Sequence, residues 1–217
     1  MDIMQNERLK ICHYLQMLEK TGLGGGGTSG NISIINRAYN LIAISPSGIS
    51  YTDIKPSQIV IVDREGNTVN SQLRPSSELK FHLEIYNKRD DLHSVVHTHS
   101  INASAYSTLG KELPAYHYII GYVGKKVPFI KYSTFGGSEL AQEIGKTLEN
   151  FNGVILGNHG VVAAGDTIDR AYACAEAIEF VCEIYFKIKN LDNVNILNDS
   201  QMEIVLEKFK SYGQGKQ

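Results

Sequence analysis

Two histidines and a carboxylate stand close enough along the chain to suggest a metal site. Ser76 and Ser77 precede Glu78, which stands at the expected start of a helix, and His97 and His99 close the apolar run that follows. Side chains alternate between the two faces of a strand, so residues two positions apart point to the same side. Two imidazoles on one side and a carboxylate would supply three of the four ligands that zinc usually takes in proteins.

A third histidine is the candidate for the remaining ligand. His159 stands in the sequence Gly157-Asn158-His159-Gly160, between predicted strands at 154–156 and 161–164. The flanking glycines suit a tight turn, and turns at strand ends are positions where binding sites are commonly built. We therefore expect His159 to complete the ligand set.

Three segments rich in glycine and small hydroxyls can converge on a phosphate. They are Thr28–Asn31, Ser47–Gly48 and Ser76–Ser77, and none of them contains lysine or arginine. Such segments bring backbone N–H and side-chain O–H donors close to an anion. The first of these segments ends a glycine-rich loop, Gly22–Asn31, which lacks the lysine of a Walker loop and does not open a helix. Neither the Walker nor the dinucleotide-binding fingerprint therefore applies.

Hydrophobic periodicity and turn signals predict the elements that must position these residues. Helices are predicted over 4–20, from 78 to 86, and over 103–109, 139–149, 167–189 and 201–212, and strands over 32–36, 41–45, 59–63, 94–98, 127–132, 154–156 and 161–164. The segment 134–138 is predicted to cap the helix after it. Short hairpin connections favour antiparallel pairing. With no repeat, low-complexity segment or linker, one domain is expected over 1–217.

The composition of the chain indicates which binding partners and which cellular compartment to expect. Hydrophobic residues make up 42% and charged residues 20%, with a net charge of -2, which fits a globular protein and disfavours nucleic acid as a partner. No apolar run approaches the ~20 residues that span a bilayer, and the amino terminus lacks a signal-peptide core. A cytoplasmic protein is expected. The three cysteines, Cys12, Cys174 and Cys182, show no metal or disulfide spacing and are predicted to pack in the core.

The combination of these motifs resembles a known family. The motifs GTSGNIS, SPSGISY, PSSELKFH, VHTHS, PAYHY, STFGG and GNHG, followed by LEKFKSYG, resemble the class II sugar-phosphate aldolases related to ribulose-phosphate 4-epimerase, and most of all the fuculose-phosphate aldolases. The resemblance implies a single-domain α/β/α sandwich with a central, mainly antiparallel sheet. It also implies a homotetramer with active sites between subunits and one Zn²⁺ per subunit.

The same resemblance implies roles for individual residues. The metal ligands would be Glu78, His97, His99 and His159. The phosphate contacts would be Gly30, Asn31, Ser47, Gly48, Ser76 and Ser77. Residues that shape the aldehyde side would be Thr28, Tyr118, Phe135 and Tyr212. Glu78 would also move the proton, and Tyr118 would be the proton donor on the aldehyde side.

The reaction implied is reversible cleavage of L-fuculose 1-phosphate to dihydroxyacetone phosphate and L-lactaldehyde through an enediolate. A 5-deoxypentulose-phosphate aldolase, a pentulose-phosphate 4-epimerase and a methylthioribulose-phosphate dehydratase remain open as alternatives on this scaffold. Related epimerases carry aspartate after the serine pair, so Glu78 favours an aldolase. A non-enzymatic, adducin-like interaction domain is disfavoured because all four candidate ligands are present.

Overall fold

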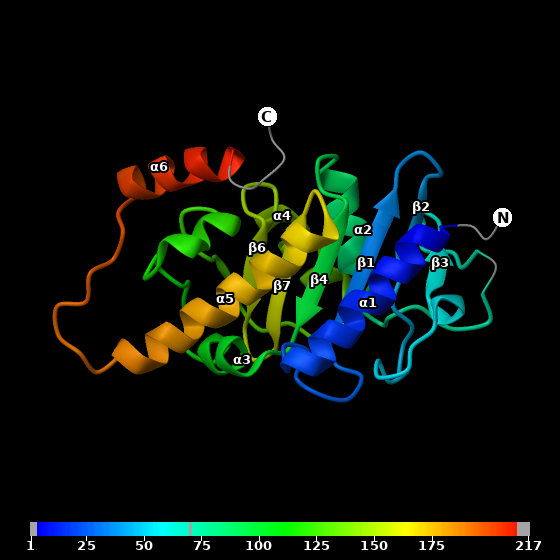
Figure 1. Ribbon diagram of the computed structural model, residues 1–217, viewed down its shortest axis with the longest axis horizontal. Coiled ribbons are helices and arrows are strands. Elements are labelled where there is room, and N and C mark those ends of the chain that lie inside the picture. Colours follow the sequence, from blue (N-terminus) through cyan, green and yellow to red (C-terminus); the bar gives the residue numbers. More distant parts are fainter. Residues whose placement is uncertain (1–3, 70, 212–217) are drawn as a thin grey trace.

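A seven-stranded sheet forms the centre of the computed structural model, which describes residues 4–69 and 71–211 (Figure 1). The strand order is β3-β2-β1-β4-β7-β6-β5. The strands are β1 Asn31–Asn36, β2 Leu41–Ile44, β3 Val60–Val62, β4 Ser94–Thr98, β5 Phe129–Ile130, β6 Gly153–Leu156 and β7 Gly160–Gly165. All neighbouring strands are antiparallel except β5 and β6. The predicted mainly antiparallel sheet is confirmed.

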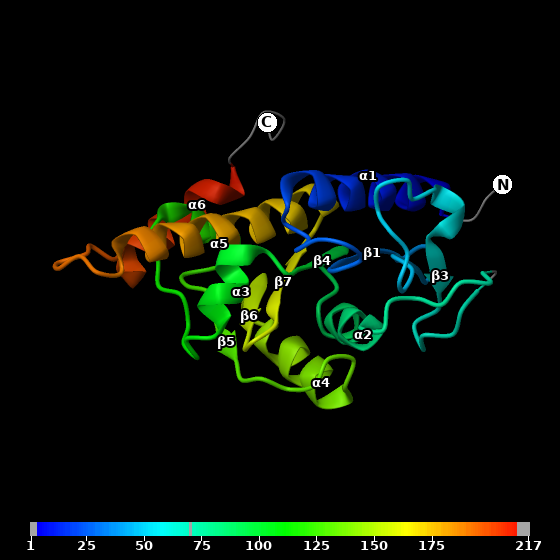
Figure 2. The same ribbon diagram turned by 90° about the horizontal axis from the view of Figure 1, so that it is seen from below.

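Helices cover both faces of this sheet. The helices are α1 Gln5–Thr21, α2 Leu79–Lys88, α3 Ile101–Ser107, α4 Ser138–Thr147, α5 Ile168–Ile188 and α6 Asp199–Lys210, with short 3-10 helices η1 Pro56–Gln58 and η2 Tyr118–Tyr122. Figure 2 shows α1 and α5 above the strands and α2 and α4 below them. The arrangement is the α/β/α sandwich expected from the sequence. None of the described helices is long and apolar enough to cross a membrane.

Alternation along the strands divides the core into two layers. Val96 and Val161 pack in the layer beneath α1 and α5, whereas Val95 and Val162 pack in the layer against α2 and α4. Because His97 lies two residues after Val95, its side chain faces the α2 side of the sheet. The three cysteines are free and buried, as predicted.

Three details differ from the sequence prediction. α4 begins at Ser138, one residue before the predicted start, and its N-cap, Gly137, lies in the predicted capping segment but is not accompanied by a side-chain cap. The strand expected over 127–132 is reduced to β5, while Val127 pairs with Leu113 in an isolated bridge. The final helix ends at Lys210, and position 212 lies outside the described residues.

Candidate metal centre and adjoining cavity

Four side chains from three parts of the fold meet at one end of the sheet. Glu78 stands just before α2, His97 lies in β4, His99 follows the end of β4, and His159 lies in the turn between β6 and β7. One ligand atom from each residue lies within 4.8 Å of the others. These are the four residues that the sequence analysis proposed as metal ligands, and the fold brings all of them together.

The distances place the nitrogen and oxygen atoms around one point. The Nε2 atom of His97 lies 3.1 Å from Oε2 of Glu78 and 2.9 Å from Nε2 of His99. The Nε2 atom of His159 lies 3.6 Å from Oε1 of Glu78. Three imidazole nitrogens and one carboxylate form a donor set that zinc accepts.

Two further contacts fit a bound cation. Nδ1–H of His97 donates to the Val161 carbonyl oxygen at 2.8 Å, so Nε2 is the ring nitrogen that faces the cluster, as in metal-ligating histidines. The Oε1 atom of Glu78 is buried and has no hydrogen-bond partner among the described residues. A buried carboxylate oxygen without a partner is costly, and a cation at this point would satisfy it.

The electrostatics of the cluster keep the carboxylate ionised. Burial opposes ionisation of Glu78, but the charges of His97 and His159 and the hydrogen bonds from His97 and Asn31 outweigh it and lower its pKa to about 2. Burial also opposes protonation of His97, yet the neighbouring Glu78 carboxylate raises its pKa. Burial and the charge of His97 lower the pKa of His99 to about 3 and that of His159 to about 4. These two rings are therefore neutral and available as ligands near neutral pH.

Two glycines allow the flanking segments to approach the end of β4. Gly30 has a φ of 77°, and a Cβ at this position would lie 2.6 Å from the carbonyl oxygen of His97. A Cβ on Gly160 would collide with the carbonyl oxygen of Thr98. Only glycine fits such positions without displacing the backbone, so both residues help to bring the candidate ligands together.

A cavity of ≈ 530 Å³ opens beside the cluster. Its lining consists of Thr28, Ser29, Gly30, Asn31, Pro46, Ser47, Gly48, Tyr51, Ser76, Ser77, Glu78, His99, Phe135 and His159. All six residues expected to contact phosphate are present, as are Thr28 and Phe135 from the expected aldehyde side. His97 lies behind this wall, fully buried. Among the described residues that line the cavity, none is lysine or arginine.

Comparison with known proteins identifies the family. The family model described as "Class II Aldolase and Adducin N-terminal domain" matches residues 9–186. The chain belongs to this family. It is a class II aldolase and thus a lyase of a metal-dependent class.

Individual relatives cover nearly the whole aldolase. A "5-deoxy-D-ribulose 1-phosphate aldolase" of Bacillus thuringiensis serovar kurstaki is 41% identical over 212 residues, covering 98% of this chain and 99% of that protein. An "L-fuculose phosphate aldolase" of Escherichia coli strain K12 is 37% identical, covering 95% and 97%. A solved structure of an "L-fuculose 1-phosphate aldolase" superposes with a TM-score of 0.91 at 38% identity, covering 94% of this chain and 96% of that one.

The structure does not bring every predicted site residue into the cavity of the aldolase. Tyr118 lies in η2, is 52% exposed and is absent from the cavity lining. Its ring instead neighbours Phe209 of α6, with ring centroids 6.3 Å apart. Tyr212 lies outside the described residues. Among the described residues, Thr28 and Phe135 are the members of the expected aldehyde side that line the cavity.

Tyr51 lines the cavity although no role was predicted for it from the sequence. The hydroxyl of Tyr51 donates to the carbonyl oxygen of Gly30 at 2.8 Å, and this buried side chain lines the cavity. Burial raises its pKa to about 12, so it remains a neutral donor that fixes the glycine-rich loop. Tyr51 belongs to the quoted SPSGISY motif, but no pattern separates it from a tyrosine that only packs.

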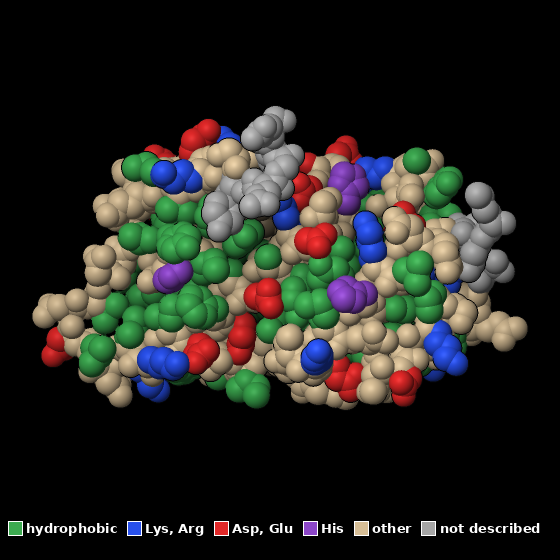
Figure 3. Space-filling model, in the orientation of Figure 1, with side chains coloured by type: hydrophobic (Ala, Val, Ile, Leu, Met, Phe, Trp, Pro, Cys, Tyr) green, Lys and Arg blue, Asp and Glu red, His purple; other side chains and the backbone are tan. Residues whose placement is uncertain are grey.

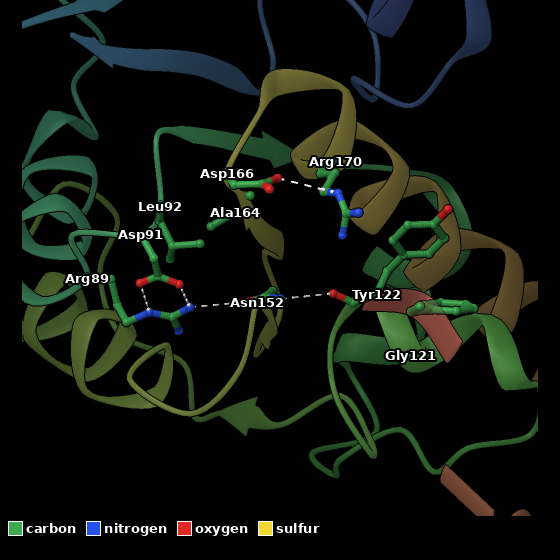
Figure 4. Close-up of a pocket in the computed structure, with 11 residues that line it drawn as sticks. Arg89, Asp91, Leu92, Gly121, Tyr122, Asn152, Ala164, Asp166 and Arg170 are labelled. Atoms are coloured by element: carbon green, nitrogen blue, oxygen red, sulfur yellow. Dashed lines mark hydrogen bonds and ion pairs between the residues drawn. The ribbon is translucent and has the colours of Figure 1, made fainter. Parts of the chain in front are cut away.

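A second cavity of ≈ 270 Å³ lies away from the cluster (Figure 4). Its two arginines already pair with carboxylates of the same chain. Arg89 binds both oxygens of Asp91 at 2.7 and 2.6 Å, and Arg170 lies 3.5 Å from Asp166. Both arginines are thus paired within the chain, and neither is left to bind an anionic ligand here. The candidate active site is therefore the cavity beside the histidines.

Proposed function

We propose that this aldolase cleaves a terminally deoxygenated ketose 1-phosphate between C3 and C4, giving dihydroxyacetone phosphate and a short aldehyde. The observation that carries the proposal is the position of the neutral-donor cavity directly beside the cluster of three histidines and Glu78. The cluster suits stabilisation of negative charge, and the cavity suits a phosphate. One Zn²⁺ per subunit is the proposed metal because the donor set is three nitrogens and one oxygen.

The chain's own residues account for the proton transfers. A zinc ion at the cluster would supply Lewis-acid stabilisation of the negative charge that develops as the bond breaks. We assign the transfers to Glu78 and Tyr118. In the condensation direction ionised Glu78 removes a proton from the hydroxymethyl carbon of dihydroxyacetone phosphate, which becomes C3, and the Tyr118 hydroxyl donates its proton to the aldehyde oxygen, which becomes the C4 hydroxyl. Cleavage reverses both transfers: the Tyr118 oxygen takes the proton of the C4 hydroxyl, and protonated Glu78 returns its proton to C3.

Phosphate binding is assigned to neutral donors. The hydroxyls of Ser47, Ser76 and Ser77 and the amide of Asn31 line one cavity with Gly30 and Gly48. Hydrogen bonds to a phosphate are strengthened by the charge of the phosphate itself, so a lysine or arginine is not needed. This assignment explains why the segments lack cationic residues.

The position of Tyr118 supports a site shared between subunits. Hydrophobic side chains gather over η2 and α5 (Figure 3), where Tyr118 is 52% and Phe180 44% exposed. We propose that this surface contacts a neighbouring subunit in a homotetramer and that Tyr118 and Tyr212 reach the neighbour's cavity, joining Thr28 and Phe135 there. The working unit would be a single aldolase domain over 1–217, acting in the cytoplasm.

Complementation tests the shared site. Tyr118→Phe and Glu78→Gln are each expected to be nearly inactive alone. Coexpression of the two variants should restore part of the activity, because some sites in a mixed tetramer then receive both native side chains. Activity of the mixture no higher than that of the separate variants would contradict a site built from two subunits.

Two substrates of the same chemical class are the candidates. L-Fuculose 1-phosphate, expected from the sequence motifs, would give L-lactaldehyde, whereas 5-deoxyribulose 1-phosphate would give acetaldehyde. The relative named for the second compound is 41% identical, against 37% for the one named for the first. Because the two identities are close, both 5-deoxyribulose 1-phosphate and L-fuculose 1-phosphate are proposed as candidate substrates.

A substrate panel tests the proposal. Zinc-loaded protein is incubated with the two ketose 1-phosphates, with a pentulose 5-phosphate and with methylthioribulose 1-phosphate, and dihydroxyacetone phosphate is measured through its reduction by a coupling dehydrogenase. We expect dihydroxyacetone phosphate from at least one of the two deoxyketose 1-phosphates. Epimerised pentulose phosphate, or loss of water from methylthioribulose 1-phosphate without cleavage, would replace the aldolase proposal with one of the other reactions of this scaffold.

A further inference from the structure

A buried chain of hydrogen bonds runs from Glu78 into the interior between α2 and β1. Nδ2 of Asn31 donates to Oε2 of Glu78 at 3.0 Å, and Oδ1 of Asn31 lies 2.6 Å from Nε2 of His82. Nδ1 of His82 lies 2.6 Å from the hydroxyl of Ser33, which lies 2.7 Å from the hydroxyl of Tyr86. All five side chains are buried. Buried polar chains of this kind hold a single arrangement when every member is satisfied.

The spacing of these residues along α2 matches their spacing along β1. Glu78, His82 and Tyr86 are four positions apart along α2 and its N-terminus, which is a rise of roughly 6 Å per step in a helix. Asn31 and Ser33 are two positions apart on β1, which is a rise of roughly 6.6 Å in a strand. The two rows therefore interleave, and each strand side chain is bonded to the helix side chains before and after it.

The ionised carboxylate of Glu78 determines which group donates and which accepts at each hydrogen bond of the chain. Ionised Glu78 only accepts, so Asn31 must turn its NH₂ group to Glu78 and its carbonyl oxygen to His82. Nε2 of His82 then carries the proton and donates to Asn31, which leaves Nδ1 to accept from Ser33. Ser33 in turn accepts from Tyr86. Burial lowers the pKa of His82 to about 3 and raises the pKa of Tyr86, so both remain neutral, as this arrangement requires.

The same chain fixes the carboxylate against the metal cluster. Asn31 and His97 are directly opposed partners of β1 and β4. Oε2 of Glu78 accepts from Asn31 at 3.0 Å and lies 3.1 Å from Nε2 of His97, so this oxygen lies between the side chains of these two residues. Oε1, in contrast, has no hydrogen-bond partner in the described structure.

We propose that His82 is a positioning residue for Glu78: through Asn31 it holds Oε2 in place and leaves Oε1 available to bind a cation. The part of this inference that concerns turnover rests on the proposed function. The part that concerns metal affinity does not. Because an amide NH₂ has two donors, Asn31 also keeps one N–H for the cavity, so its expected role toward phosphate is compatible with this chain.

Substitutions of His82 separate hydrogen bonding from packing. His82→Leu keeps an apolar side chain of comparable bulk but removes the donor to Asn31, whereas His82→Gln offers an amide N–H at the position of Nε2. We expect His82→Leu to weaken zinc binding, measured by competition with a chelating dye, by roughly 10- to 100-fold. The kcat of the zinc-saturated protein should fall over the same range with little change in KM, and His82→Gln should recover most of both losses.

Two tyrosine variants provide a matched comparison in which only one hydroxyl is removed. Tyr86→Phe shortens the chain at its far end. Tyr106→Phe removes a hydroxyl that donates to the carbonyl oxygen of Glu112, from an equally buried ring that packs against Tyr185. We expect Tyr86→Phe to raise the zinc dissociation constant at least severalfold and Tyr106→Phe to leave it unchanged, even where both lower Tm by similar amounts.

The outcomes separate this inference from the proposed function. Wild-type zinc affinity in folded Tyr86→Phe, or in His82→Leu with a native Tm, would overturn the positioning role. Equal losses in His82→Gln and His82→Leu would also overturn it, because packing alone would then explain the effect. If the wild-type protein cleaves neither deoxyketose phosphate, the proposed substrate class fails, while the zinc affinities still decide the role of His82.

Discussion

The Nε2 atoms of His97 and His99 face each other at 2.9 Å. Two unprotonated ring nitrogens at this distance repel each other through their lone pairs, so a proton or a cation must lie between or beside them. Nδ1–H of His97 is already committed to the carbonyl oxygen of Val161. The arrangement is that of a site built to share a cation, with Glu78 and His159 completing the set.

Loss of one imidazole is expected to abolish tight zinc binding. His97→Ala and His159→Ala each remove one of four candidate ligands, and affinity depends on the complete set. Zinc content after dialysis against a weak chelator measures the effect. His13→Ala, which removes an exposed histidine of α1, is the control and should keep full zinc. Full occupancy in either cluster variant would remove that histidine from the ligand set.

Glu78→Gln is expected to retain the fold and some metal but to lose turnover. An amide of nearly the same shape can still contact the cation but cannot transfer a proton, and general acid–base catalysis typically contributes about 10²- to 10⁴-fold. The kcat of the zinc-loaded variant should fall by at least about 100-fold, with a Tm close to that of the wild type. Near-normal cleavage would rule out Glu78 as the proton carrier.

Ser47→Ala is expected to weaken only the recognition of phosphate. A hydrogen bond to a charged group contributes about 1.5–3 kcal/mol, so kcat/KM for the phosphorylated ketose should fall roughly tenfold or more, while the small kcat/KM for the unphosphorylated ketose stays the same. Ser50→Ala, in the same loop but outside the cavity lining, serves as the control. A parallel loss with both substrates would mean that Ser47 acts on the loop and not on the phosphate.

The buried His82 ring predicts a loss of stability on acidification. Its pKa is about 3 in the folded chain, against an ordinary value of 6.5, so the unfolded chain binds more protons between these values. The free energy of unfolding should therefore fall as pH drops below about 6.5, by up to about 1.4 kcal/mol per pH unit from this residue. His99 and His159 act in the same direction, and His97, whose pKa is raised, acts in the opposite one.

Urea unfolding with a chelator present measures this dependence. His82→Gln, which has no titratable group at this position, should show a shallower fall in the free energy of unfolding between about pH 6.5 and about pH 4 than the wild type. The same slope in both proteins would mean that His82 takes up its proton over the same pH range in the folded and unfolded chains.

The candidate ligands were predictable because their signal is local. His97 and His99 are two positions apart, which places them on one side of a strand, and the glycines around His159 indicate a turn at a strand end. Because zinc commonly binds histidine and carboxylate side chains, these residues and Glu78 could be proposed as one ligand set. The serine and glycine segments were predictable for a similar reason, since small residues without cations suit contact with an anion.

The residues that align Glu78 were not predictable in this way. His82 stands in an amphipathic helix where a buried histidine has many explanations, and its bond to Asn31 depends on how α2 lies along β1. That relation arises from packing between segments far apart in the chain. Tyr118 was named from the family resemblance, but in the described chain its side chain is 52% exposed and does not line the cavity, so its role rests on the proposed neighbouring subunit.

Metal reconstitution tests whether cleavage depends on zinc bound by the three histidines and Glu78. The purified protein is stripped with a chelator, titrated with zinc, and assayed for dihydroxyacetone phosphate from 5-deoxyribulose 1-phosphate and L-fuculose 1-phosphate. We expect the stripped protein to be inactive, and activity with at least one substrate to rise linearly to a plateau at one zinc per chain. Undiminished cleavage by the stripped protein, or a plateau unrelated to zinc bound at the cluster, would contradict this expectation.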